Sequence, residues 1–299
     1  MRSVTYNNLF KMSAESGKLY NFTRTVDTSP NFLVSTNNGQ TWTYGGRLTS
    51  TPQVGYVAGY YKYWGNDVDR IDFLATEAHP RDNDNSLYHG YIKGGQVYDS
   101  LDRVVDNNLN DANAHEIVDF TRVFQTGTMV NGLRLNRLWN FDIARYADGT
   151  IGALWKARVN GTQGEANPDH RILYSRFNGT TWTSTYLVKG GLKLYDSEQD
   201  YVGGAALDPD DPHVIYVSTT YDPRDDTTLL GKHEIWKGVT CNNGTSFTWT
   251  PVTMNSTVDN LRPVVPKWNA TNQALLWFRG TYQTAQIYDA DVVGIITRR

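Results

Sequence analysis

Apolar and polar residues alternate over short stretches of this chain, and turns rich in glycine, asparagine and aspartate separate these stretches. Alternation with a period of about two residues indicates β-strands with one buried face, whereas the helical period of about 3.6 residues is weak throughout. With the turns as fixed points, the pattern predicts five repeats of short strands. The predicted strands are Val4–Ser13, Lys18–Arg24, Asn31–Ser35 and Thr41–Gly45 in the first repeat; Val54–Tyr63, Arg70–Thr76, Ser86–Ile92 and Gln96–Leu101 in the second; Leu138–Tyr146, Ile151–Val159, Arg171–Phe177 and Thr181–Val188 in the third; Tyr201–Asp208, Val214–Thr220, His233–Gly238 and Ser246–Val252 in the fourth; and Leu261–Trp268, Ala274–Arg279 and Gln286–Ile296 in the fifth, whose outermost strand is not evident.

One turn recurs between the last two strands of these repeats. Ser35–Trp42 fits the pattern Ser-x-Asp-x-Gly-x-x-Trp with Asn37 in the aspartate position, and Ser175–Trp182 and, more loosely, Thr240–Phe247 repeat it. Asparagine bonds nearby backbone amides, glycine accepts a positive φ, and the aromatic side chain covers the turn. Lys93–Tyr98 keeps only the glycine turn and the aromatic residue. A turn that recurs at the same point indicates a repeated supersecondary unit.

Repeated four-stranded units predict an all-β fold, a β-propeller of about five blades in a single domain that spans residues 1–299. A β-sandwich is the alternative, but it would not place the same turn at the same point of each repeat. Residues 102–137 form an insertion of uncertain structure between the second and third repeats. Five repeats suit either a small five-bladed ring or the C-terminal part of a larger, seven-bladed propeller.

Charge and composition exclude several classes of binding partner for this protein. The net charge is −3, the pI is about 6.1, and lysines and arginines are dispersed along the chain, which argues against nucleic acid. No segment approaches the ~18 apolar residues of a membrane helix, so no membrane partner is expected. The single cysteine, Cys241, excludes an intrachain disulfide. Several Asn-x-Ser/Thr acceptor sequences favour a secreted or periplasmic protein, although no signal peptide opens the chain.

Propeller geometry predicts where functional side chains gather. The recurrent turns lie at one face, so the loops between the second and third strands of each blade, and the starts of the innermost strands, lie at the other. Four of the six histidines fall in these segments. The candidate catalytic residues are Tyr6, Arg24, His79 and His89, and the candidate substrate-binding residues are Arg81, Arg158, His170, Tyr221, His233, Arg262, Arg279 and Tyr282.

The densest of these segments also has simpler explanations. His79 precedes a proline and can begin a turn, and Arg81 can pair with Asp82 or Asp84 at the surface. Asp82, Asp84, His89 and His79 could together hold a cation, but their spacing matches no zinc or calcium pattern. We therefore expect neither a metal nor an organic cofactor.

Several phrases of the sequence resemble the BNR-4 repeat propellers, a family that carries this type of Asp-box turn. The resemblance lies in Val4–Phe10, Leu19–Arg24, His79–His89, Asn260–Pro263 and Trp277–Tyr282. The family includes polysaccharide lyases of the ulvan lyase type, which are seven-bladed propellers. The phrases of the family's early blades, including the catalytic histidines, have no counterpart before Met1. We therefore expect either a truncated homologue or a chain that has dispensed with that half of the site.

The resemblance implies a site for eliminating a uronic acid from an acidic polysaccharide. It matches the catalytic tyrosine of these lyases to Tyr6 and the catalytic arginine to Arg24. Arg24 would neutralise the uronate carboxylate and Tyr6 would act as acid or base, while His79, Arg81 and His89 would shape the subsite.

Three alternatives remain open at this point. A sialidase-like glycosidase could use Arg24, Arg262 and Arg279 as a carboxylate clamp, but it needs a Tyr–Glu nucleophile pair and glutamate is scarce on the predicted face. A non-catalytic module could hold a sugar with the same aromatic and arginine side chains. A scaffold would present this face only as solvated polar surface.

Overall fold

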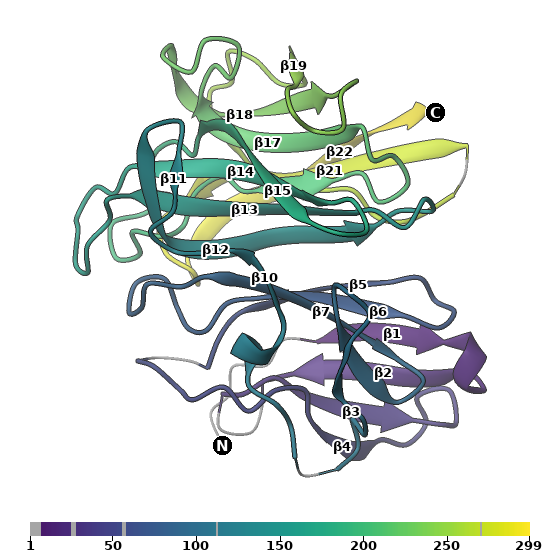
Figure 1. Ribbon diagram of the computed structural model, residues 1–299. Coiled ribbons are helices and arrows are strands. Elements are labelled where there is room, and N and C mark those ends of the chain that lie inside the picture. The colour runs from purple at the N-terminus through teal and green to yellow at the C-terminus, as the bar shows by residue number, and fades with distance from the viewer. Residues whose placement is uncertain (1–6, 25–27, 56–57, 112, 270) are drawn as a thin grey trace. The chain divides into compact units, whose positions relative to one another are not determined.

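The computed structural model describes the chain except residues 1–6, 25–27, 56–57, 112 and 270 (Figure 1). Strands form five antiparallel sheets, and the only helices in the described part are two short 3-10 turns, η1 (Ser13–Glu15) and η2 (Ile117–Asp119). The predicted all-β propeller fold with about five blades is confirmed. Contacts within the chain divide it into two compact units, Met1–Thr126 and Gly127–Arg299. None of the helices in the described part is long and apolar enough to span a membrane.

The first unit contains two sheets, and each follows the order of its strands along the chain. The first sheet has the order β1-β2-β3-β4 and the second β5-β6-β7-β8-β9, with β10 paired to β7. The strands are β1 (Asn8–Met12), β2 (Lys18–Thr23), β3 (Asn31–Ser35), β4 (Thr43–Arg47), β5 (Tyr61–Gly65), β6 (Ile71–Ala75), β7 (Leu87–Lys93), β8 (Gln96–Asp99), β9 (Val104–Asp106) and β10 (Thr121–Phe124).

Aromatic side chains from both sheets form the core of the first unit. Phe22 and Phe32 of the first sheet are fully buried together with Phe73 of the second. Tyr63 of β5 stacks on Phe22 with 4.5 Å between ring centroids. Each such ring contributes roughly 1.5–3 kcal/mol through its burial, so this core holds both sheets of the unit together.

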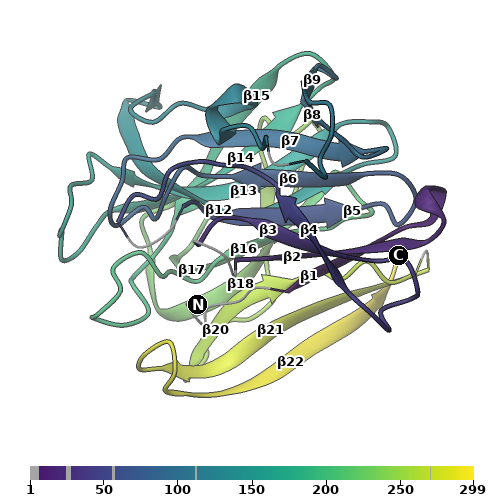
Figure 2. The ribbon, with the colours of Figure 1, turned by 90° about the horizontal axis from the view of Figure 1, so that it is seen from below.

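The second unit contains three sheets, with orders β11-β12-β13-β14-β15, β16-β17-β18-β19 and β20-β21-β22. In Figure 2 the long strands β21 and β22 run side by side along the third of these sheets. The strands are β11 (Met129–Val130), β12 (Leu133–Arg145), β13 (Ile151–Val159), β14 (His170–Phe177), β15 (Trp182–Lys189), β16 (Ala205–Leu207), β17 (Val214–Tyr221), β18 (Leu229–Val239), β19 (Thr248–Pro251), β20 (Asp259–Val264), β21 (Asn272–Tyr282) and β22 (Tyr288–Arg298).

Two of the three recurrent turns have the structure that their sequence predicts. At Ser175–Trp182 the Ser175 hydroxyl instead bonds Trp155 and Ser184, and the Asn178 side chain accepts the Thr181 amide. In the first turn, the Ser35 hydroxyl accepts a hydrogen bond from the Gly39 amide at 2.9 Å, and the side-chain oxygen Oδ1 of Asn37 accepts one from the Thr41 amide at 2.9 Å. The turn at Thr240–Phe247 repeats both bonds, at 3.0 Å each, with threonine replacing serine. Each turn joins the last two strands of its sheet, β3 to β4 and β18 to β19.

The insertion at 102–137 is where the sequence was least informative. Its strands extend neighbouring sheets: β9 pairs with β8 and β10 with β7 in the first unit, while β11 pairs with β12 in the second. These strands are only two to four residues long, and β10 pairs with a strand some thirty residues earlier, so local alternation did not reveal them.

Two predicted strands begin later in the structure because glycines interrupt them. The second sheet starts at Tyr61 rather than Val54, because Gly59 has φ +98° and comes so close to the Thr76 carbonyl that a Cβ there would clash. The fourth starts at Ala205 rather than Tyr201, because Gly204 has φ +92°. A left-handed residue ends the extended conformation and turns the preceding side chains away from the ladder.

Candidate functional site

The loop between β6 and β7 of the first unit is held rigidly by its own polar side chains. Asn85 donates to the Ala78 carbonyl at 2.6 Å and accepts the Ala78 amide at 2.9 Å. Glu77 accepts the Ser86 amide at 2.8 Å and the Tyr88 hydroxyl at 2.9 Å. A loop fixed at both ends presents its remaining side chains in one geometry, as a binding or catalytic site requires.

This loop places His79 beside Tyr60, and Tyr60 also contacts Arg24. The His79 ring meets the Tyr60 ring edge-on, with 5.3 Å between centroids. The Arg24 guanidinium lies over the same ring at 4.7 Å from its centroid. Arg24 and His79 are 5% and 2% exposed, whereas Tyr60 is half-buried. Two of the predicted catalytic residues thus meet through a tyrosine that the prediction omitted.

Tyr60 could have been found from the sequence. It stands at the start of the innermost strand of its sheet, a segment that propeller geometry marks as functional, but the predicted strand ran through it from Val54. Its backbone is fixed by Thr76, which accepts the Tyr60 amide at 3.1 Å through its hydroxyl. Tyr6, the other predicted catalytic residue, lies outside the described residues.

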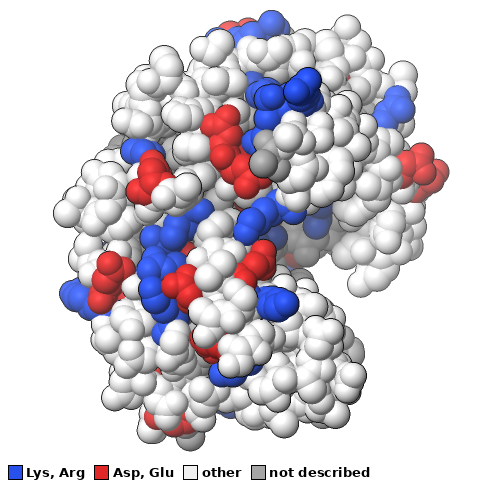
Figure 3. All heavy atoms as spheres, turned by 90° about the vertical axis from the view of Figure 1, so that its right-hand side faces the viewer, with Lys and Arg blue, Asp and Glu red and all other residues white. Residues whose placement is uncertain are grey.

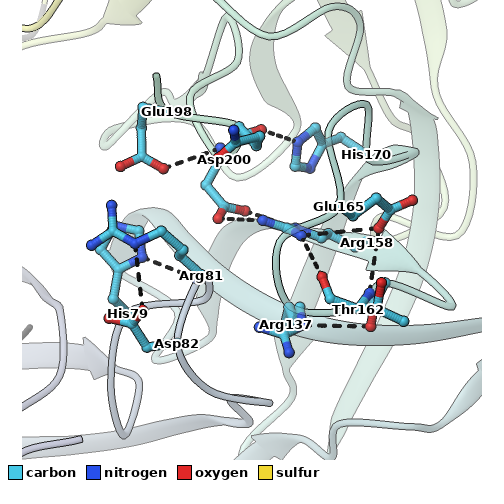
Figure 4. Close-up of polar contacts among 12 residues, drawn as sticks. His79, Arg81, Asp82, Arg137, Arg158, Thr162, Glu165, His170, Glu198 and Asp200 are labelled. Carbon is cyan, nitrogen blue, oxygen red and sulfur yellow. Dashed lines mark hydrogen bonds and ion pairs between the residues drawn. The ribbon is translucent and has the colours of Figure 1, made fainter. Parts of the chain in front are cut away.

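The protonation of His79 follows from its partners. Its Nδ1 accepts the backbone amide of Arg81 at 3.0 Å, so the neutral ring carries its proton on Nε2 (Figure 4). The Arg81 side chain pairs with Asp82 at 3.4 Å and is 36% exposed. A pair this exposed contributes at most about 1 kcal/mol, so Arg81 positions His79 mainly through its backbone.

His89, also predicted to be catalytic, is fully buried in the second sheet. Its Nδ1 contacts the Ser100 hydroxyl at 2.8 Å and its Nε2 contacts the Asp72 carboxylate at 3.0 Å. Both ring nitrogens are therefore engaged inside the sheet, and His89 is 0% exposed. This arrangement gives His89 a structural part in the blade, and it leaves the ring no nitrogen for a cation shared with Asp82, Asp84 and His79.

In the second unit, Asp200 joins two buried cations. Its carboxylate accepts Lys156 Nζ at 2.8 Å, Arg158 Nε at 3.0 Å and Arg158 Nη2 at 2.6 Å (Figure 4). All three side chains are at most 1% exposed. Burial by itself would raise the pKa of Asp200, but Lys156 and Arg158 lower it well below its usual value. Burial lowers the pKa of Lys156.

His170, from β14, completes this cluster as a neutral ring. Burial, and then the charge of Lys156, lower the pKa of His170 to about 3. Its Nε2 donates to the Gln199 carbonyl at 2.7 Å, and its Nδ1 accepts from Lys156 Nζ at 3.3 Å. The cluster therefore ties the segment that carries Gln199 and Asp200 to strands β13 and β14. Arg158 and His170 were predicted to bind substrate. In the structure their polar atoms form hydrogen bonds within the protein.

Acid should weaken the second unit through His170. Its pKa is about 3 in the folded protein and about 6.5 when unfolded, so between these values only the unfolded state gains the proton. The free energy of unfolding is therefore expected to fall as the pH falls through this window, by up to about 1.4 kcal/mol per pH unit. Urea unfolding at pH 7 and pH 5 measures this slope. His170→Gln should flatten it, whereas His213→Gln, at an exposed site, should leave it unchanged; equal slopes in all three proteins would contradict the assignment.

The remaining predicted residues lie at separate places in the second unit. His233 is 3% exposed and bonds Asp259 at 3.0 Å through Nδ1, which makes it an internal tie between β18 and β20. Tyr221 is half-buried beneath Lys189, at 4.8 Å. Arg279 is exposed on β21. Arg262 and Tyr282 are brought together, with the guanidinium 5.6 Å from the ring centroid.

Acidic and basic side chains are interspersed on the face drawn in Figure 3, without a broad area of one sign. This distribution suits a ligand recognised by a few charged groups and rings.

Comparisons with known proteins identify the fold. No family model matches the chain, and no curated protein matches it. Among solved structures, an ulvan lyase described as a new polysaccharide lyase family, PL25, is similar at a TM-score of 0.63 with 15% identity, over 98% of this chain and 64% of that one. The chain thus spans about two thirds of the length of this lyase.

Two looser matches have TM-scores below one half. A thermostable family-43 glycoside hydrolase matches at 0.47 with 10% identity, over 99% of this chain and 89% of that one. A lectin of Aleuria aurantia, in complex with Fucα1-6GlcNAc, matches at 0.44 with 11% identity, over 98% and 79%. These structural neighbours are carbohydrate-active or carbohydrate-binding propellers, and at such identities the likeness establishes the fold alone.

Proposed function

We propose that this protein is a carbohydrate-active propeller that cleaves an acidic polysaccharide by β-elimination at a uronic acid. The observation that carries the proposal is that Arg24 and His79 both contact the ring of Tyr60, which brings a guanidinium, a phenol and an imidazole together in the first unit. These are the three kinds of group that uronate elimination uses. The phrases that resemble the ulvan lyase type, and the fold shared with a lyase of that type, support the same reaction. A polymer of this kind is extracellular, which fits a secreted or periplasmic protein.

The reaction needs a base, an acid and a cation. A base removes the proton from C5 of the uronate, the C5 electron pair forms the C4=C5 double bond, and the bond from C4 to the glycosidic oxygen breaks. The acid returns a proton to that oxygen, which leaves as the hydroxyl of the released sugar. Negative charge spreads onto the carboxylate during proton removal, so a cation at the carboxylate lowers the barrier.

Arg24 is the cation in this proposal. Its guanidinium can hold both carboxylate oxygens with parallel hydrogen bonds, and its low exposure limits competition from water. Tyr60 supports the guanidinium from one side through its ring.

His79 is suited to protonate the leaving oxygen. Since Nδ1 accepts the Arg81 amide, the transferable proton of the neutral ring is on Nε2. A ring that presents a donor cannot at the same time accept the C5 proton there. The base is therefore a different group, and Tyr6 is our assignment because the family resemblance matches it to the catalytic tyrosine.

A non-catalytic sugar-binding module is the second candidate. His89, Arg158 and His170 are buried, and their polar atoms are hydrogen-bonded inside the protein. Fewer side chains are then available for catalysis, which favours this candidate. Both candidates bind an acidic sugar, and they differ in whether a double bond is formed.

Ultraviolet absorbance of the unsaturated product separates the two candidates. The intact protein is incubated with ulvan, polygalacturonate and alginate, and reducing ends are measured in parallel. Elimination gives new absorbance together with reducing ends, and Tyr6→Phe and Arg24→Ala should abolish both. Reducing ends without absorbance would indicate hydrolysis, and saturable binding without either product would leave only the binding module. Absorbance that survives both substitutions would contradict the residue assignment.

A further inference from the structure

A continuous line of aromatic side chains crosses the second unit from its charged interior to its surface. Trp139, Tyr201, Tyr195, Tyr282 and Tyr288 follow one another with 5.5, 5.6, 6.4 and 5.3 Å between successive ring centroids. Trp139 contacts Lys156 of the buried cluster at 5.4 Å. The first four side chains are half-buried and Tyr288 is 55% exposed. We call these five side chains the aromatic track.

The track is fixed in place by elements that are themselves tied down. Tyr195 and Tyr201 flank a tight turn whose base is closed by the Leu194 amide bonding the Tyr201 carbonyl at 2.8 Å. The same turn carries Asp200, which is anchored on β13. Tyr282 and Tyr288 are directly opposite one another at the end of the β21–β22 ladder. Rings held this way lose little conformational entropy when a ligand stacks on them.

Arg262 lies against the middle of the track. Its guanidinium is 5.3 Å from the Tyr201 centroid and 5.6 Å from the Tyr282 centroid. The residue has φ +52° within β20, where the ladder to β21 shifts register between Leu261 and Val264. Its amide donates to the Gly203 carbonyl at 2.6 Å. A bulge of this kind re-aims a side chain, and here it directs an arginine at the rings.

Arg262 has no acidic partner among the described residues. Arg262 is exposed, and across the described ranges no carboxylate lies within ion-pair distance of its guanidinium. Arg158 in the same unit differs, because Asp200 holds it at two atoms. An exposed guanidinium between two rings, with no acidic side chain beside it, is a site for an anionic ligand.

We propose that the aromatic track and Arg262 bind an acidic oligosaccharide, with pyranose faces stacked on the rings and a sugar carboxylate on Arg262. The rings supply apolar area for sugar C–H faces, and the guanidinium supplies paired hydrogen bonds that fix position and select for negative charge. The choice of a uronate rests on the proposed function. Binding of an oligosaccharide to the aromatic track does not depend on the elimination reaction.

The backbone of Arg262 supports a role in binding. A non-glycine residue with positive φ is uncommon and costs stability, and glycine is the residue that adopts this conformation freely. Gly204, just before β16, has φ +92°, and a Cβ there would lie 3.6 Å from Arg262 Cα. The use of the Arg262 side chain in binding accounts for an arginine at this position.

Calorimetric titration of the intact protein tests the site. The probes are an oligogalacturonate, a neutral cello-oligosaccharide of equal length, and a sulfated galactan oligosaccharide without uronate. The oligogalacturonate should bind tightest. Arg262→Ala should weaken its binding about 10–100-fold, and Tyr282→Ala about 3–10-fold. The matched controls are Arg298→Ala, at the opposite end of β22 from Tyr288, and Tyr44→Ala, an exposed tyrosine of the first unit; both should bind like the wild type.

The variant Arg262→Gly distinguishes a role of Arg262 in ligand binding from a role in the stability of the protein. It should bind as weakly as Arg262→Ala while its Tm stays at or above that of the wild type, since glycine suits the positive φ. Wild-type affinity in either Arg262 variant, or a lower Tm of the glycine variant with unchanged affinity, would overturn the site. Equal or tighter binding of the neutral or sulfated probe would overturn the assignment to uronates.

The two proposals fail independently. Arg24→Ala lies in the first unit, so it should abolish elimination and leave oligogalacturonate binding at the track. Tight binding without any unsaturated product would overturn the elimination and support the track. Elimination by the wild type, together with wild-type affinity for oligogalacturonate in Arg262→Ala, would overturn the track and leave the elimination standing.

Discussion

Replacing Asp200 with alanine is expected to lower the free energy of unfolding by about 3–5 kcal/mol, because it removes the carboxylate that neutralises the buried Lys156 and Arg158. Both cations are at most 1% exposed, and among the described residues the other carboxylate paired with either of them is Glu165, 3.9 Å from Arg158. The loss should appear as a lower urea midpoint for the second unit. It should also weaken oligosaccharide binding, since the turn that carries Tyr195 and Tyr201 loses its anchor.

Two variants control this prediction. Asp196 pairs with Lys193 on the same loop but its side chain is 99% exposed, so Asp196→Ala should change the free energy of unfolding by less than about 0.5 kcal/mol. Adding Lys156→Met to Asp200→Ala removes one of the stranded charges and should recover part of the loss. Equal destabilisation by Asp196→Ala and Asp200→Ala would show that the buried cluster contributes no more than a surface pair.

The second large effect is expected on catalysis. Arg24→Ala should reduce kcat for uronate elimination by about 10²–10³-fold, since it removes the charge that stabilises the developing anion. Arg24→Lys should restore only part of the rate, because an ammonium cannot hold both carboxylate oxygens in the fork geometry of arginine. The rate of product absorbance under saturating polyuronate measures both variants.

The first unit offers a matched control for Arg24. Arg70 also lies over a tyrosine, with its guanidinium 4.0 Å from the Tyr91 centroid, but it precedes β6, whereas the His79 loop follows β6, and it contacts a different ring. Arg70→Ala therefore removes an equivalent cation–π contact and should leave kcat unchanged. Loss of activity in Arg70→Ala to the same degree as in Arg24→Ala would show that the effect comes from folding of the unit and would contradict the role of Arg24.

Features set by neighbouring residues were predictable from the sequence. The strands Asn31–Ser35 and Ile151–Val159 have the bounds that their alternation and flanking turns predict. The turns at Ser35–Trp42 and Thr240–Phe247 form because a hydroxyl, an amide and a glycine stand at fixed offsets, and such bonds need no other part of the chain. The blade order followed from these turns, since each joins the two outer strands of its sheet.

The candidate site was only partly predictable. The sequence selected Arg24, His79, Arg262 and Tyr282, but its criterion, position near a strand end, also selected His89, whose two ring nitrogens contact Ser100 and Asp72 inside the protein. Which face of a strand a side chain occupies depends on the pairing register, and a shift of one residue reverses it. The sequence did not identify Tyr60 as the residue that contacts Arg24 and His79, because it assigned Tyr60 to the interior of a predicted strand.

What the sequence by itself determined is the all-β repeat, its turns and the segments in which functional side chains gather, since these depend on short-range alternation and turn chemistry. The tertiary structure decided which of those side chains meet. Arg24 and His79 both contact Tyr60, Asp200 neutralises Lys156 and Arg158, and a bulge directs Arg262 to the aromatic track. These contacts join residues far apart in the chain, and their geometry depends on strand register and bulges that no local pattern encodes.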